Sequence, residues 1–198
     1  MKGLCCVNST LPASLTLLTG LKHLDLGHTG MSLTAATAFI PAINKMHQLQ
    51  HLALTTFKRD EQEGVKDVLQ PPTLMLRTSM MHLDLSYTGL YNLDVIPVAD
   101  HLDLSSTHLD LQGMKALLPA LQAMTLMQSL NLDWNDLDSR AVVVLCRALP
   151  RMSQIKGLRL SNAFKEEEDV SRMLLGVALS GALKNMTQLE DLISASII

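Results

Sequence analysis

One short pattern recurs seven times along the chain: an apolar residue, two further residues, then leucine-x-leucine. The copies span Leu21–Leu26, Leu49–Leu54, Met80–Leu85, Ala99–Leu104, Met127–Leu132, Ile155–Leu160 and, incompletely, Leu189–Ser194. Alternating apolar residues predict a short strand with one buried face. A strand this narrow cannot bury its apolar face alone, so copies must stack until neighbours cover one another. The pattern therefore predicts a solenoid.

The spacing of the copies predicts what connects the strands. The first leucine of each pair lies at positions 24, 52, 83, 102, 130, 158 and 192, and three of the intervals are 28 residues long. That length leaves room for a helix, and apolar residues at helical spacing occupy 109–127, namely Met114, Leu117, Leu118, Leu121 and Met124. Asp110 and Asp138 stand where helix N-caps belong. Strands that return in one direction after each crossover form a parallel sheet.

These strand–helix copies resemble the leucine-rich repeat family, in its ribonuclease-inhibitor-like type, which is also found in NOD-like receptor sensor regions and Ran GTPase-activating proteins. The resemblance implies one α/β horseshoe over residues 1–198, with a parallel sheet on the concave face, helices on the convex face and about seven repeats, as a fragment or without caps. The family's buried ladder residue follows each first leucine by five positions. Asn135 fits that rule, whereas Phe57 and Ala163 cannot supply the hydrogen bonds and predict altered loops.

Two kinds of interval depart from the regular repeat. The 19-residue interval before Leu102 is too short for a full helix and contains Pro97, so it predicts an extended or single-turn convex segment. The two longest intervals carry charge runs at 58–63 and 165–169. These runs are interpreted as solvated inserts, with a regulatory or docking loop as the alternative.

Composition excludes several classes of function. Aromatic residues are only 3% and the net charge is −3, which argues against binding nucleic acid. No cysteine–histidine spacing suggests zinc, and no apolar run reaches the length of a membrane span. The start of the chain does not resemble a signal peptide. We therefore expect a cytoplasmic protein without cofactor or enzymatic activity. The alternative is an extracellular location, where Asn8 and Asn185 would be glycosylation acceptors.

Residues beside the leucines form rows across the predicted concave face. One row contains four histidines, and the next contains acidic residues at Asp25, Asp84 and Asp103. The histidine row has three readings: ordinary solvated surface, a pH-sensitive surface that weakens partner binding below pH ~6, or a metal site. A flat sheet argues against the metal site, because its ligands would not converge.

Trp134 lies in a third row, at the rim, together with Tyr87 and His28. Exposed aromatic rings on a rigid scaffold are typical anchors for protein partners. The alternative is that Trp134 folds over the neighbouring loop as half-buried packing. The predicted partner-binding residues are His23, Asp25, His28, His51, His82, Asp84, Tyr87, His101, Asp103, Asn131, Asp133, Trp134 and Arg159.

The sequence thus favours a protein-interaction scaffold with a basic or mixed-charge protein partner and the capacity to self-associate through uncapped ends. Two alternatives stay open. One is a GTPase-activating or other regulatory leucine-rich repeat protein, and the other is an extracellular repeat antigen.

Overall fold

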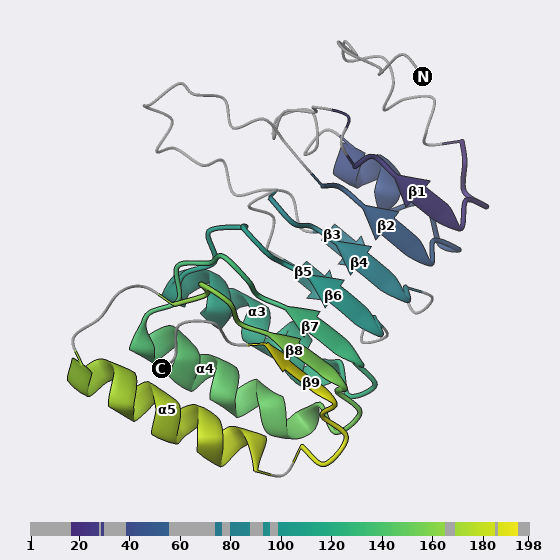
Figure 1. The fold of residues 1–198 in the computed structure, drawn as a ribbon. Coiled ribbons are helices and arrows are strands. Elements are labelled where there is room, and N and C mark those ends of the chain that lie inside the picture. Colours follow the sequence, from purple (N-terminus) through teal and green to yellow (C-terminus); the bar gives the residue numbers. More distant parts are fainter. Residues whose placement is uncertain are drawn as a thin grey trace, which may run out of the picture.

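The chain coils into two layers, with a parallel sheet on one side and helices on the other (Figure 1). This computed structural model describes residues 17–27, 29, 39–55, 74–76, 80–87, 93–95, 99–164, 169–184 and 186–193. Within these residues the main sheet has the order β1-β2-β4-β6-β7-β8-β9, and every neighbouring pair is parallel. Its strands are β1 (His23–Asp25), β2 (His51–Ala53), β4 (His82–Asp84), β6 (His101–Asp103), β7 (Ser129–Asn131), β8 (Gly157–Arg159) and β9 (Asp191–Ile193). The predicted α/β solenoid with a parallel sheet is confirmed.

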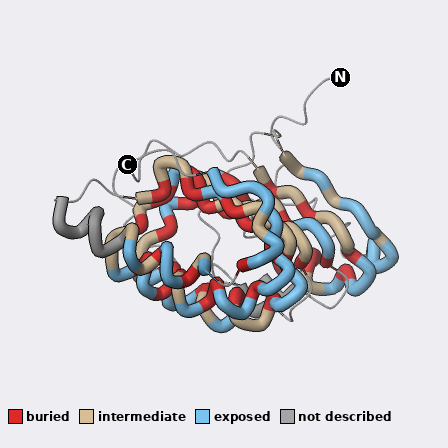
Figure 2. Tube along the Cα trace, turned by 60° about the horizontal axis from the view of Figure 1, so that its bottom comes forward, coloured by how far each residue is buried: buried red, intermediate tan, exposed pale blue. Residues whose placement is uncertain are grey.

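The leucines of the repeated pattern form the core. In the register of the sheet each central leucine pairs with the next, from Leu24 through to Leu192. Those of the inner strands are at most 2% exposed, as are the second leucines of the same copies, which include Leu104 and Leu132. The buried segments gather along the inside of the coil (Figure 2). At the edge strands Leu24 is half-buried and Leu192 is 48% exposed, because each has a neighbouring strand on one side only.

Helices form the other layer in the part of the chain that the structure describes. They are α3 (Leu111–Ala123), α4 (Ser139–Ala148) followed by the 3-10 turn η1 (Leu149–Arg151), and α5 (Asp169–Leu183), with a further helical turn at residues 39–43. The carboxylate of Asp110 accepts hydrogen bonds from the amides of Gln112 and Gly113, and that of Asp138 accepts one from Ala141. Both predicted N-caps are therefore confirmed.

A second, two-stranded sheet is formed by one strand from each of two successive intervals, the one between β2 and β4 and the short one between β4 and β6. It consists of β3 (Leu74–Leu76) and β5 (Leu93–Val95), which pair in parallel, and β5 contacts α3. The extended segment predicted before Leu102 is confirmed by β5. Its partner β3 was not predicted, because three residues are too few to show a periodicity.

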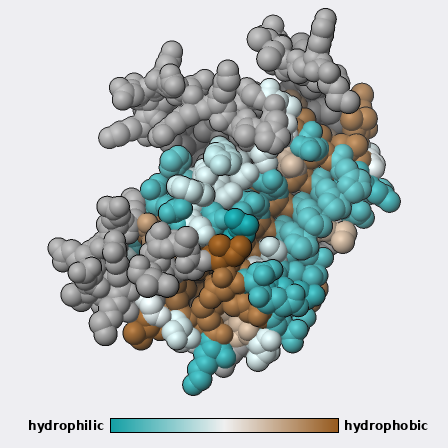
Figure 3. Space-filling view, in the orientation of Figure 1, coloured by the Kyte–Doolittle hydropathy of each residue, from teal (hydrophilic) through white to brown (hydrophobic). Residues whose placement is uncertain are grey.

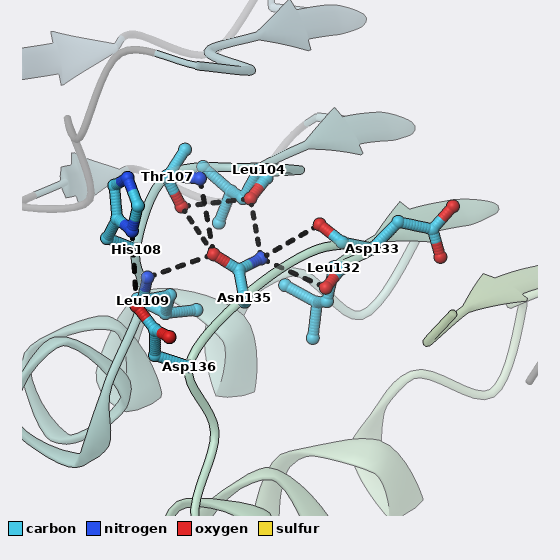
Figure 4. Close-up of polar contacts among 8 residues, drawn as sticks. All are labelled: Leu104, Thr107, His108, Leu109, Leu132, Asp133, Asn135 and Asp136. Carbon is cyan, nitrogen blue, oxygen red and sulfur yellow. Dashed lines mark hydrogen bonds and ion pairs between the residues drawn. The ribbon is translucent and has the colours of Figure 1, made fainter. Parts of the chain in front are cut away.

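Asn135 joins two repeats through a buried hydrogen-bond network (Figure 4). Its side-chain oxygen accepts from the amides of Thr107 (3.2 Å) and Leu109 (2.9 Å). Its amide nitrogen donates to the carbonyl oxygens of Leu104 and Leu132, both at 2.9 Å. All four bonds go to backbone atoms that no strand pairs, so this side chain replaces a ladder where the chain turns. The interpretation of Asn135 as the ladder residue is confirmed.

The loop at Ala163 differs from this arrangement, as predicted from a side chain that cannot form hydrogen bonds. The Ala163 amide donates to the carbonyl of Leu160, and the Leu137 amide donates to the carbonyl of Ala163. Leu137 and Phe164 form an isolated parallel bridge. Backbone pairing thus supplies the contact between repeats. The other altered loop, at Phe57, and residues 58–63 and 165–168 of the charge runs lie outside the described residues.

Among the described residues no helix is both long enough and apolar enough to cross a membrane.

Candidate partner-binding face

Three rows of side chains cross the open face of the main sheet. The register aligns His23, His51, His82, His101, Ser129 and Gly157 in the first row. It aligns Asp25, Ala53, Asp84, Asp103, Asn131 and Arg159 in the second. Tyr87, Ser106, Trp134 and Asn162 follow at the turns after the strands and form the rim. A hydrophilic band crosses the strands beside a hydrophobic stripe (Figure 3). We call the first two rows together the sheet face.

The four histidines form a continuous stack. Successive ring centroids lie 4.3, 4.5 and 4.2 Å apart, and the ring planes differ by only 16–18°. This spacing follows from the distance between neighbouring strands, roughly 4.8 Å. Parallel rings do not point their nitrogens at a common centre, and no group of three or more His, Cys, Asp or Glu among the described residues is arranged to hold a metal ion.

Stacking also changes how the histidines take up protons. Partial burial lowers the pKa of His51, and the neighbouring His82 and His23 lower it further. Partial burial likewise lowers the pKa of His82, with His101 adding to the effect and Asp100 opposing it. In the pH-sensitive reading of this row, the two inner rings therefore take up protons only at lower pH than an unperturbed histidine.

The lowered pKa values of His51 and His82 make the stability of the fold depend on pH. The folded-state pKa values of His51 and His82 lie below the value in the unfolded chain, so the unfolded state binds protons first as the pH falls. Stability is therefore lost as the pH drops below about 6.5. In urea titrations at pH 7.5 and 5.5, the double variant His51→Gln, His82→Gln should show a smaller loss of midpoint than wild type. Equal losses in the two proteins would contradict this assignment.

Side chains of the second row also form hydrogen bonds that shape the turns after the strands, a role that the sequence analysis did not predict. Asp25, Asp84 and Asp103 each accept a hydrogen bond from the amide two residues later, and Asn131 does the same with the amide of Asp133. These bonds turn the chain at the ends of β1, β4, β6 and β7. Burial raises the pKa of Asp84, which the hydrogen bonds from Ser86 oppose and the charges of Asp103 and Asp25 reinforce. The row therefore combines turn formation with a negative surface.

Asp133 was predicted to lie at the partner-binding surface, but its side chain is buried in the structure. It is only 3% exposed, and its Oδ2 accepts from Nε (2.9 Å) and Nη2 (2.8 Å) of Arg159. Its Oδ1 accepts from the Ser161 amide at 2.7 Å. A buried carboxylate bonded in this way holds two repeats together. Arg159 keeps an exposed side chain (49%), but its charge is balanced by Asp133.

The rim is the most unusual part of the backbone. Tyr87, Ser106, Trp134 and Asn162 have φ of 62°, 54°, 58° and 51°, in the left-handed region. Asparagine tolerates this conformation, whereas bulky side chains adopt it rarely. Tyr87 is nevertheless 57% exposed and Trp134 61% exposed, so the alternative reading of Trp134 as mainly buried packing does not hold. His28, predicted for the same row, lies outside the described residues.

Comparison with known proteins finds a family match to part of the chain and several similar solved structures. The family described as "Leucine Rich repeat" matches residues 123–146, which run from the end of α3 through β7 into α4. No curated protein matches the chain. Among solved structures, "Leiomodin-1 Actin-Binding Site 2 (ABS2)" is similar with a TM-score of 0.40 and 14% identity, over 92% of this chain and 76% of that chain. The tropomodulin C-terminal domain of Caenorhabditis elegans is similar with a TM-score of 0.42 and 11% identity, over 94% of this chain and 83% of that chain.

Proposed function

We propose that this leucine-rich repeat protein is an interaction scaffold, which binds a basic protein partner through its sheet face with Trp134 as the rim anchor. The observation that carries the proposal is the conformation of Trp134. It combines a φ of 58° with 61% exposure, so the chain bears both backbone strain and an exposed indole at one position. Strained backbone that presents an aromatic ring outward is a feature of binding sites.

The neighbouring repeat shows that the fold does not need this side chain. Asn162 occupies the equivalent turn with nearly the same φ, 51°, and it is a residue that tolerates this conformation. The backbone amide of Trp134, which donates to the carbonyl of Ser161, would be kept by any residue other than proline. Large amphipathic rings with few rotatable bonds are frequent anchors in protein interfaces.

The charge of the sheet face supports a basic partner. Asp25, Asp84 and Asp103 lie in one row, and the single cation of that row, Arg159, is already paired with Asp133. A surface with unbalanced negative charge steers and orients a positively charged partner.

The variant Trp134→Asn tests the proposal. Two opposing terms of about 1–2 kcal/mol each, the relief of left-handed strain and the loss of the partly buried ring, should leave stability within about 1 kcal/mol of wild type. Partner affinity should fall by roughly 30-fold, since an anchor contributes on the order of 2 kcal/mol. Affinity capture from cells with wild type as bait, followed by titration of the captured protein with both forms, measures this.

Leu126→Asn is the matched control. Leu126 is similarly exposed (57%), but it lies in the turn between α3 and β7, away from the rim. It should retain full affinity. If Trp134→Asn bound as tightly as this control, the anchor assignment would be wrong.

A further inference from the structure

The stack of imidazoles ends abruptly, and the two following positions of the row carry almost no side chain. His101 has the ring of His82 on one side at 4.2 Å. On its other side the register places Ser129 and then Gly157, before the row resumes at Asp191. Among the described residues, no other ring therefore covers the outer face of the His101 ring. We call the space above Ser129 and Gly157 the row gap.

Nothing in the fold requires a glycine at position 157. Its φ is outside the left-handed region, and a Cβ placed there would meet only Ser129, with Oγ at 3.6 Å and Cβ at 4.0 Å. These are ordinary van der Waals contacts. Glycine within a strand costs roughly 0.5–1 kcal/mol relative to alanine. It is typical of places where a ligand or another chain approaches closely.

The surroundings of the row gap are acidic. Asp103 lies in the second row on β6, Asp100 directly precedes His101 at the start of the same strand, and Glu190 and Asp191 lie at the start of β9, whose Asp191 is aligned with Gly157. The cations nearby are Lys156, just before β8, and Arg159, whose guanidinium is held by Asp133. The strands on both sides of the row gap thus carry four carboxylates, of which Asp103 is hydrogen-bonded by Asn131, against one ammonium group, and this net negative charge favours a cationic occupant.

We propose that the row gap receives the guanidinium group of an arginine from the protein partner, stacked on the outer face of His101 in line with the imidazole row. This inference rests on the proposed function and names the chemistry of the partner at one point of the sheet face. A guanidinium is planar and stacks on aromatic rings, and it pairs with carboxylates through several N–H donors. A lysine ammonium lacks the plane, and an uncharged aromatic ring lacks the charge.

The test uses three blocked pentapeptides, Gly-Gly-X-Gly-Gly with X as arginine, lysine or tyrosine, titrated into the full chain and followed by NMR. The arginine peptide should shift the ring signals of His101 and the amide signal of Ser129 saturably. Its dissociation constant should be at least about fivefold lower than that of the lysine peptide. Equal binding of the arginine and lysine peptides, tighter binding of the tyrosine peptide, or no saturable shift at these two residues would overturn the proposal.

Substitutions locate the site. Gly157→Val fills the row gap with a good strand former and should weaken arginine-peptide binding at least tenfold without lowering Tm. Gly181→Val, at an exposed position of α5 where an added Cβ meets nothing, should leave binding unchanged. His101→Gln should weaken binding about fivefold, whereas His101→Phe keeps a ring for stacking and should retain it. Retained binding in both Gly157→Val and His101→Gln would refute the site, even if one of the two variants folded poorly.

The outcome is separable from that of the proposed function. Trp134 lies in the rim row rather than at the row gap, so the partner titration of Trp134→Asn and the peptide titration of the wild-type chain report on different positions. If Trp134→Asn lost the partner and the peptide test failed, the scaffold function would stand. Only the proposed arginine site at the row gap would be removed.

Discussion

Asn135→Ala is expected to destabilise the chain by about 3–5 kcal/mol, the largest effect of any single polar substitution considered. The change leaves the amides of Thr107 and Leu109 and the carbonyl of Leu132 without their side-chain partner, while the carbonyl of Leu104 keeps a bond from the Thr107 hydroxyl. Each buried backbone group without a partner costs roughly 1–3 kcal/mol, and water entering the turn recovers part of the total. Urea unfolding followed by circular dichroism measures the loss.

Asn131→Ala is the control for this measurement. Asn131 also makes two side-chain hydrogen bonds, to Asp103 and to the amide of Asp133, but it lies half-exposed on the sheet face where water can replace them. Its loss should be nearer 1 kcal/mol. A similar midpoint for the two variants would show that Asn135 does not hold the repeats together.

Leu132→Ala is expected to cost about 2–5 kcal/mol, because Leu132 is fully buried and its neighbours in the stack cannot collapse onto the space. Leu126→Ala provides a comparison with the same chemical change at a side chain that is 57% exposed, and should cost less than about 1 kcal/mol. Overlapping urea midpoints for the two variants would contradict the assignment of buried and exposed leucines.

The regular part of the fold could be predicted because the sequence of each repeat shows which of its residues are buried. Leucine-x-leucine fixes which side chains face the core, and the equal spacing fixes the register, so the rows of the sheet face follow from counting. The N-caps Asp110 and Asp138 and the ladder residue Asn135 are local features of single repeats, which is why sequence reasoning found them.

The remaining features depend on contacts between repeats or on backbone angles. In the sequence Asp133 has the pattern of a surface carboxylate, and its pairing with Arg159, 26 residues later, is seen only in the structure. The short strand β3 pairs with β5, which lies 19 positions further along the chain. The left-handed turns at Tyr87 and Trp134 contradict the preferences of those residues, so no propensity argument could place them. Gly157 was visible in the row, but its significance required knowing that neither backbone nor neighbours demand a glycine.

Hydrogen–deuterium exchange of the chain with and without its captured partner tests the central claim, that the sheet face and rim form the binding surface. The amides of the rim turns are held by single bonds, such as that from Ser106 to Asp133 and that from Trp134 to Ser161, and they should exchange readily in the free chain. Binding should slow exchange at 84–87, 103–106 and 131–134 and leave α4 unchanged. Protection confined to α3, α4 and α5, with the rim turns unaffected, would contradict the account and move the partner to the helical layer.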